Sequence, residues 1–223
     1  MVEQQQITCQ STLMKMIAGV EKPDSGMIDK KIKISYKPQY LTNDIDVEVI
    51  TMLDKANGGS IEDSTEEEQI IEPLRIKKLY NKSMKYLSGG ELQKVAVATC
   101  LLQKVDLYAL DEPSAFLDVE DRIAVGKFLQ KFCRSFGKSA IVIDHDLQLM
   151  DLVSDSMVIF EGTSSIEGHA TSPLPKIDAM NRFLKSLDIT FRRDEKSRRP
   201  RVNKDGSRLD KDQKGSQNYY YKK

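Results

Sequence analysis

The sequence predicts an α/β fold built on a mostly parallel sheet, and three observations indicate it. Two short apolar stretches, "VDLYALDEP" at 105–113 and "SAIVIDHD" at 139–146, carry branched residues and end in charged ones, as buried parallel strands do. The segment between them, Arg122 to Phe136, has the apolar spacing of a helix. Such alternation of strands and helices is typical of domains in which helices connect parallel strands.

Further elements are expected on either side of this unit. Ser11 is placed to cap a short helix that ends at Gly19, with its apolar residues on one face (Leu13, Met14 and Ile17). Alternation of Ile32, Ile34 and Tyr36 with polar residues predicts a half-buried strand, and the polar segment 46–86 is mostly helical in pattern. One more helix is expected over 177–187, and little regular structure past Arg192.

Charge is balanced over the whole chain but unevenly placed. The 223 residues include 34 Lys and Arg and 34 Asp and Glu. Residues 190–223 hold 12 basic and 5 acidic residues, a net charge of +7, so the preceding residues carry −7. A basic tail on an acidic body favours a polyanionic partner. A solvated, disordered tail explains the charge equally well.

Cysteine usage and hydropathy exclude several classes of protein. The three cysteines, Cys9, Cys100 and Cys133, are scattered without a C-x-x-C pair. This pattern argues against a disulfide framework and against a zinc or iron–sulfur site. No stretch approaches the roughly 18 apolar residues of a membrane-spanning helix, and the N-terminus has no signal-peptide pattern. We therefore expect a cytoplasmic protein with no membrane partner.

Charged residues that follow the two apolar strands are candidates for chemistry. Asp111 and Glu112 close the first strand, and His145 lies between two aspartates after the second. In parallel sheets, ligands collect at the carboxyl ends of strands. One carboxylate there can hold Mg²⁺ while the other orients an attacking water, and a histidine can bind a phosphate. Taken singly, the carboxylates also fit an ordinary solvated pair and the histidine a structural role.

A second candidate is the start of the helix within "YLSGGELQKVAVATCLLQ". Helical spacing of its apolar residues places Ser88 at the first position, where Ser88 and Glu91 form a capping box. Gly89 and Gly90 expose backbone N–H groups at the positive end of the helix, as a phosphate-binding site requires. Capping and phosphate binding are equally compatible with this stretch alone.

Taken together, these pieces resemble ATP-binding cassette (ABC) domains. Gln39 follows a strand in "SYKPQYL", and then come "LSGGE", "LYALDEPSAFLD" and "IVIDHD". Their order and spacing are similar to the Q-loop, the signature, Walker B with its D-loop, and the switch histidine of that family. Three stretches narrow the resemblance to one subfamily: the tail "ITFRRDEKSRRPRVNKDGS", the final "YYY" and "LSGGELQKVAVA". They look like the second nucleotide-binding domain and C-terminal hinge of subfamily E, the ribosome-recycling ATPases also called RNase L inhibitors.

This resemblance implies a fold, cofactors, partners and site residues. The fold is a P-loop NTPase-like sheet with a helical signature subdomain, divided into a cassette over 1–168 and a hinge-like segment with a basic tail over 169–223. ATP and Mg²⁺ are the implied cofactors, with ribosomal RNA as a partner of the tail. Glu112 and His145 are implied to be catalytic. Nucleotide contacts are implied for Ser11, Thr12, Gln39, Ser88, Gly89, Gly90 and Asp118, and Mg²⁺ contacts for Ser11, Gln39 and Asp111.

The sequence departs from the family before Ser11. A phosphate-binding P-loop has the pattern G-x-x-x-x-G-K-[ST], whose glycines and lysine surround the phosphates. When Ser11 is set at the last position, Gln10 replaces the lysine, and Ile7 and Cys9 lie where glycines are expected. The family's iron–sulfur domain, first cassette and β-rich start of the second cassette also lack counterparts. We therefore expect a truncated gene copy or a misassigned first exon.

Three consequences are expected from this departure. ATP and Mg²⁺ should bind weakly or in trans, opposite a full-length subfamily E protein or another cassette. No iron–sulfur cluster is expected in this chain. A missing central strand should leave backbone groups unpaired beside the Walker B strand, which favours aggregation.

Several functions remain open from the sequence. The leading interpretation is a subfamily E cassette related to ribosome recycling and translation, with impaired autonomous ATPase activity. An ATPase that binds nucleotide through an unusual loop is the first alternative. A ribosome- or RNA-binding module with a relic cassette is the second, and an ATPase subunit of an ABC transporter is the third. Whether this chain is an enzyme is thus undecided by its sequence.

Overall fold

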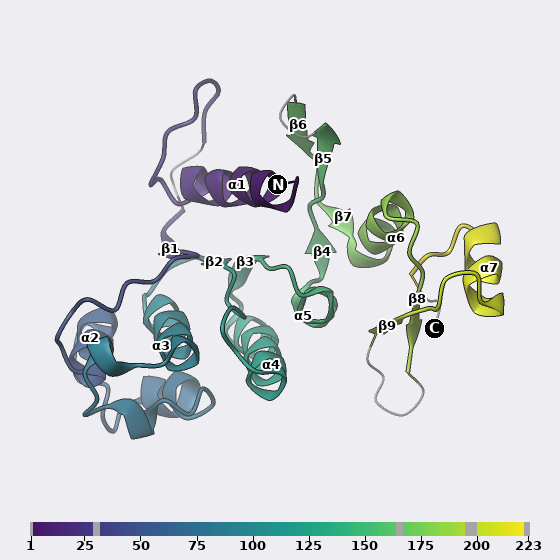
Figure 1. Cartoon of the computed structure of the whole chain (residues 1–223). Helices are drawn as coiled ribbons and strands as arrows, with labels where there is room; N and C mark the ends of the chain where they lie inside the picture. The colour runs from purple at the N-terminus through teal and green to yellow at the C-terminus, as the bar shows by residue number, and fades with distance from the viewer. Residues whose placement is uncertain (1, 29–31, 164–166, 195–199, 221–223) are drawn as a thin grey trace. The chain divides into compact units, whose positions relative to one another are not determined.

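The candidate site is built on a three-stranded parallel sheet. The computed structural model of the chain describes residues 2–28, 32–163, 167–194 and 200–220. The sheet has the order β1-β2-β3, from β1 (Ile34–Lys37), β2 (Leu107–Asp111) and β3 (Ser139–Ile143). Helix α4 (Val119–Phe136) connects β2 to β3, as the sequence predicts (Figure 1). The expected α/β fold with a parallel sheet is confirmed.

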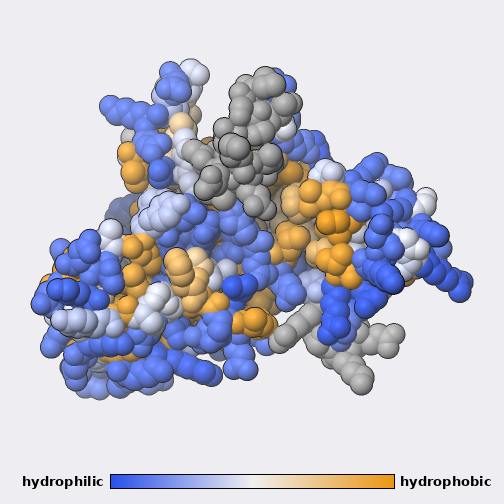
Figure 2. Space-filling view, in the orientation of Figure 1, coloured by the Kyte–Doolittle hydropathy of each residue, from blue (hydrophilic) through white to orange (hydrophobic). Residues whose placement is uncertain are grey.

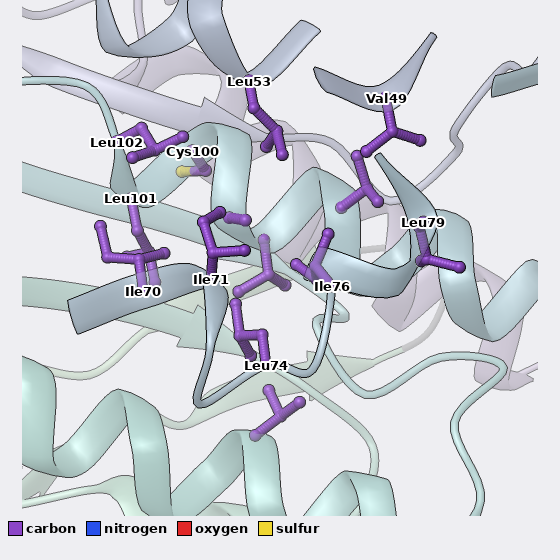
Figure 3. Close-up of a cluster of buried hydrophobic side chains, with 14 of the residues drawn as sticks. Val49, Leu53, Ile70, Ile71, Leu74, Ile76, Leu79, Cys100, Leu101 and Leu102 are labelled. Atoms are coloured by element: carbon purple, nitrogen blue, oxygen red, sulfur yellow. The ribbon is translucent and has the colours of Figure 1, made fainter. Parts of the chain in front are cut away.

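A helical subdomain is inserted between β1 and β2. It contains α2 (Val49–Asn57), the π-helix η1 (Glu67–Ile71), the short 3-10 helices η2 (Lys77–Leu79) and η3 (Met84–Tyr86), and α3 (Gly89–Leu101). Their apolar side chains point toward one another and are nearly inaccessible to solvent (Figure 3). The cluster includes Val49, Leu53, Ile70, Ile71, Leu74, Ile76, Leu79 and Leu101. Burial of this cluster fixes α3, which carries the signature residues.

The strand β1 differs in one respect from the alternation of the sequence. Its polar residues Ser35 and Lys37 are 1% and 2% exposed, whereas Ile34 and Tyr36 are only partly buried. Ser35 satisfies its hydroxyl by donating to the Cys100 carbonyl at 2.9 Å. These two polar side chains can be buried on the inner face of the sheet because they form hydrogen bonds there.

The prediction of a short helix that begins at Ser11 is wrong. Helix α1 runs without a break from Val2 to Ile17, so Ser11 lies inside it and not at its start. Residues 2–17 contain no glycine or proline and are rich in glutamine, methionine and other residues that tolerate helix. Nothing in this stretch therefore stops the helix where a phosphate-binding loop would lie. The predicted end holds, because Gly19 adopts φ 75° just after the helix.

The expectation of unpaired backbone beside the Walker B strand is also wrong. That strand is β2, and it is paired along its length with β1 on one side and β3 on the other. Among the described residues the sheet has two edge strands, β1 and β3, each of which pairs only with β2. Ile141 of β3 is 37% exposed, whereas its neighbour in register, Ala109, is fully buried. This uncharged strand without proline is the part of the sheet most prone to pair with another chain.

The described residues from 156 to 187 form two short antiparallel strand pairs and one helix. Helix α6 (Lys176–Ser186) matches the helix expected over 177–187. It is preceded by two antiparallel pairs, β4 (Ser156–Met157) with β7 (Leu174–Pro175) and β5 (Phe160–Thr163) with β6 (Glu167–Ala170). Helix α5 (Leu147–Val153) leads into them from the sheet. No described helix has the length and apolarity that crossing a membrane requires.

The prediction of little regular structure past Arg192 is wrong. Strands β8 (Phe191–Arg193) and β9 (Pro200–Val202) pair, and α7 (Arg208–Gly215) follows with Ser207 as its cap. A buried polar network holds these elements together: the Thr190 hydroxyl donates to Asp210 at 2.5 Å, and Asn203 donates to Thr190 at 2.9 Å. These contacts are between residues 13 and 20 positions apart, so composition alone does not reveal them.

Two of the C-terminal tyrosines are buried, which contradicts the solvated, disordered tail that the charge pattern also allowed. Tyr219 and Tyr220 are 7% and 3% exposed, and the Tyr220 hydroxyl donates to the buried Asp151. Their rings are therefore neither on a floppy terminus nor free to stack on bases. Tyr221 lies outside the described residues, as do Arg198 and Arg199 of the expected basic tail.

The chain divides into two compact units. One comprises Ile7–Leu149, and the other Met150–Lys223 with Met1–Gln6. All sequence-predicted site residues belong to the first unit. The division between a cassette over 1–168 and a hinge-like segment over 169–223 stays a prediction about function.

Candidate functional site

The carboxyl ends of the three parallel strands bring three predicted site residues together. Gln39 follows β1, Glu112 follows β2 and His145 follows β3. Gln39 Nε2 donates to Glu112 Oε1 at 2.7 Å, and His145 Nε2 lies 3.0 Å from the same oxygen. The Glu112 side chain is 17% exposed and that of His145 is 54% exposed. A carboxylate shared in this way is partly desolvated yet reachable from solvent, as a water-activating group must be.

Asp111 has the environment expected of a group that holds a hard cation. It is the last residue of β2 and is fully buried. Its Oδ1 atom receives no hydrogen bond from any described residue, while Oδ2 lies 3.4 Å from the Tyr36 hydroxyl. An orphaned carboxylate oxygen suits Mg²⁺, bound directly or through water. Burial, together with the charge of Asp111, raises the pKa of Tyr36 to about 12.

The described residues offer Mg²⁺ few protein ligands. They contain no group of three or more His, Cys, Asp or Glu that is arranged to hold a metal. This fits a Mg²⁺ ion that is bound by one or two carboxylates and the phosphates of its nucleotide. Ser11, a further predicted ligand, has a buried hydroxyl without a hydrogen-bond partner among the described residues. No hydrogen bond between described residues joins Ser11 or Thr12 to Gln39, Asp111 or Glu112, so their assignment remains a prediction.

The start of α3 is built as the sequence predicts. The Ser88 hydroxyl accepts from the Glu91 backbone at 3.3 Å, and the Ser88 backbone donates to Glu91 Oε2 at 2.9 Å. Gly89 and Gly90 pack closely against Phe116: an added Cβ would lie 3.2 Å from the Phe116 Cβ atom at Gly89 and 3.0 Å from its carbonyl oxygen at Gly90. The two glycines therefore also have a packing role. Their amides remain candidates for phosphate binding.

The predicted nucleotide contact Asp118 has a structural role in this fold. Its side chain accepts from the Asp121 backbone at 2.8 Å and so caps α4. Phe116, two residues earlier, is 80% exposed and has φ 60°, a left-handed conformation that is uncommon for a residue with a side chain. The segment between β2 and α4 thus presents an exposed aromatic ring beside the signature glycines.

Two buried polar residues at the site were missed by sequence reasoning. Lys37 is the last residue of β1, and burial lowers its pKa to about 8 despite nearby carboxylates that oppose this shift. Gln93 lies one turn into α3 and is fully buried. The one signal in the sequence that could have identified Lys37 is a charged residue at the carboxyl end of the predicted strand, in "ISYKPQ".

The capping box generates a prediction about pH. A hydrogen bond from Lys82, followed by one from the Ser88 backbone, lowers the pKa of Glu91 from 4.5 to about 2. Since the folded pKa lies below the unfolded one, the stabilisation is complete above pH 4.5 and is lost as the pH falls to about 2. Glu91→Gln should therefore lower the free energy of unfolding by about 1 kcal/mol near neutrality.

Urea unfolding of both proteins between pH 7 and the acid range checks this. The difference between wild type and Glu91→Gln should vanish toward pH 2, whereas Glu68→Gln, at an exposed glutamate, should show little difference at any pH. If the difference in unfolding free energy between wild type and Glu91→Gln does not depend on pH, the charge of Glu91 does not stabilise the capping box.

Comparisons with known proteins agree with this geometry. The family described as ABC transporter matches residues 10–115. An uncharacterised ABC transporter ATP-binding protein of Methanocaldococcus jannaschii is 45% identical over 95% of this chain, and translation initiation factor RLI1 of Saccharomyces cerevisiae is 39% identical over 96%. The chain spans 35% of the length of each of these two relatives. ABC transporter E family member 3 of Arabidopsis thaliana is 33% identical over 62% of this chain and 80% of its own length.

Solved structures give the same result. RNase-L inhibitor matches with a TM-score of 0.88 at 43% identity, over 95% of this chain and 41% of that one. A ribosome-bound archaeal Pelota and ABCE1 assembly matches with a TM-score of 0.89 at 43% identity, over 96% and 36%. The chain therefore belongs to subfamily E of the ABC proteins, the family of the RNase L inhibitors.

Proposed function

We propose that this chain is a subfamily E cassette that works in ribosome recycling and translation and does not hydrolyse ATP by itself. One observation carries the proposal. The groups that would act on a nucleotide's outer phosphate, Gln39, Glu112 and His145, are assembled, but helix α1 occupies the sequence positions of the loop that would hold the phosphates. The chain thus has the groups that would act on a phosphate held by another cassette, and it lacks the loop with which an autonomous ATPase would hold the phosphates itself.

The helix explains why the cradle is lost. In a P-loop, glycines allow successive backbone N–H groups to converge on the phosphates. Within an α-helix such as α1, each interior N–H group already donates to the carbonyl four residues earlier. Gln10 also cannot supply the charge of the missing lysine. At about 1.5–3 kcal/mol for each charged hydrogen bond, the loss of several such contacts lowers the ATP affinity of this half-site by orders of magnitude.

The remaining groups have definable roles. Asp111 would hold Mg²⁺ through its unpartnered oxygen, and Glu112 would accept a hydrogen bond from a water placed beside the phosphate. Bound Mg²⁺ supplies positive charge that neutralises the phosphates. His145, exposed at the rim, would donate to a phosphate oxygen. Ser88, Gly89 and Gly90 would contribute their hydroxyl and amide groups to a nucleotide held by another cassette.

The named functions of relatives support the biological part of the proposal. RLI1 of yeast is described as a translation initiation factor, and solved relatives are an archaeal ribosome recycling factor with the stalk protein aP1 and a ribosome-bound assembly with Pelota. A role on the ribosome implies a cytoplasmic protein. An ABC transporter subunit is less well supported, because zinc import ATP-binding protein ZnuC 1 of Aliivibrio fischeri is 34% identical over 68% of this chain, whereas RLI1 of yeast is 39% identical over 96%.

The first prediction from the proposed function concerns nucleotide binding in trans. Mixing this chain with a cassette that has an intact P-loop should raise that cassette's ATP affinity, about tenfold for one or two new hydrogen bonds. Ser88→Arg should abolish the gain because it blocks the start of α3. Ser60→Arg places the same side chain at an exposed position of the loop that follows α2 and should keep the gain. Equal affinity with and without this chain, measured by titration calorimetry, would count against a role in trans.

The second prediction concerns the basic C-terminal residues. Arg192 and Lys204 are exposed, whereas Arg201 pairs with Asp194 at 3.3 Å. The surface over α7 is mainly hydrophilic (Figure 2). We expect Arg192 and Lys204 to bind ribosomal RNA phosphates. Replacing both with glutamine should weaken ribosome binding and flatten the slope of log K against log salt by roughly 0.7–0.9 for each lost phosphate contact.

Ribosome co-sedimentation across a salt series provides the measurement. Substitution suits this region better than truncation, because the described residues 191–194 and 200–220 include buried groups such as Phe191, Asn203 and Asp210. Lys127→Gln with Lys131→Gln removes the same charge from exposed positions on α4 and serves as the control. If both double variants bind with equal affinity and equal salt dependence, the C-terminal charges are not the anchor.

A further inference from the structure

The backbone carbonyl of Glu112 is held by two buried side chains from different elements. Lys37 Nζ donates to it at 3.2 Å and to the Asp111 carbonyl at 2.7 Å. Gln93 Nε2 donates to the same Glu112 carbonyl at 2.5 Å. Lys37 is 2% exposed and Gln93 is fully buried. Two donors from β1 and α3 therefore converge on one peptide oxygen inside the protein.

The peptide that they hold has an unusual conformation. Glu112 has φ 47°, in the left-handed region, although it carries a side chain. Its N–H group donates to the Ile143 carbonyl at 2.7 Å, which fixes the other side of the residue to β3. Strained backbone of this kind persists where the surrounding structure determines it from several directions. Here β1, α3 and β3 each contribute one contact.

The chemistry of the two side chains is specific to this contact. Strand β1 pairs Lys37 with Leu110, a fully buried residue, so an apolar side chain would satisfy the packing at this place. A buried lysine is instead destabilised by the loss of water. Gln93 Oε1 has no hydrogen-bond partner among the described residues, so the hydrogen bond of this side-chain amide is made by its N–H group. In both residues the useful feature is the N–H donor.

We propose that Lys37 and Gln93 are positioning residues that hold the Glu112 peptide in its left-handed conformation and so direct its carboxylate toward Gln39 and His145. Gln93 lies on the helix that begins with Ser88, Gly89 and Gly90. The helix that presents the signature residues thus also holds the backbone of the carboxylate. The inference rests on the proposed function for the importance of Glu112, but the contact itself exists without nucleotide.

The two histidines of the chain allow a direct test. His145 contacts Glu112, and His169 lies in the other unit near Glu161 at 3.5 Å. Proton NMR at pH 7, without nucleotide, resolves one Hε1 signal for each ring, and Glu112→Gln marks where the His145 signal lies once its carboxylate partner is removed. Lys37→Met and Gln93→Met should each move the His145 signal toward that position and leave the His169 signal in place.

Two further variants separate positioning from general destabilisation. Lys94→Met breaks the neighbouring ion pair of α3 with Asp121, 2.7 Å long, and should leave the His145 signal unchanged. Lys37→Arg retains a cationic donor and should return the signal part of the way to its wild-type position. Folded Lys37→Met and Gln93→Met proteins that both keep the wild-type His145 signal would overturn the proposal.

Loss of folding is also decisive. If one methionine variant fails to show a cooperative thermal transition, the other decides the outcome. If neither folds, the two side chains serve the fold as a whole, and a specific action on Glu112 is rejected. Because no nucleotide is present, failure of this test leaves the proposed role in trans untouched, and the reverse also holds.

Discussion

The parallel pairing of β1, β2 and β3 is the constraint on which the candidate site depends. Parallel strands end on the same side of a sheet, so Gln39, Glu112 and His145, far apart in sequence, meet within hydrogen-bond distance. The central strand β2 is paired on both sides, which fixes the position of Asp111 and Glu112 most firmly. Around it, α3 adds the signature residues, held in turn by the apolar cluster of the helical subdomain.

The stretch before Ser11 shows how strongly glycine decides between a loop and a helix. With glycines, a chain at this place can turn and expose its amides to a phosphate. Without them, residues 2–17 form one continuous helix, and the interior amides are used within it. The absence of these glycines and of the lysine thus removes charge, curvature and free donors together, while Gln39, Glu112 and His145 on the strand ends stay in contact. Under the proposed function, the chain then complements a cassette that still has the loop.

Features that depend on neighbouring residues could be predicted from the sequence, and those that depend on distant ones could not. The strand and helix from 107 to 136, the capping box at Ser88 and the helix near 177 follow from local periodicity and capping. The fold after Arg192 depends on contacts such as that of Thr190 with Asp210, and the burial of Lys37 depends on carbonyls 74 and 75 residues away. Alternation in "ISYK" even indicated the wrong inner face, because hydrogen bonds outweigh apolarity there.

The most direct test of the central claim is the ATPase rate of the isolated, purified chain compared with that of its Glu112→Gln variant. If α1 has replaced the phosphate cradle, the two rates are equal and close to background, although Glu112, Gln39 and His145 are in contact. A clear turnover by the wild-type chain that Glu112→Gln abolishes would show that this cassette holds and hydrolyses ATP on its own, and would contradict the account.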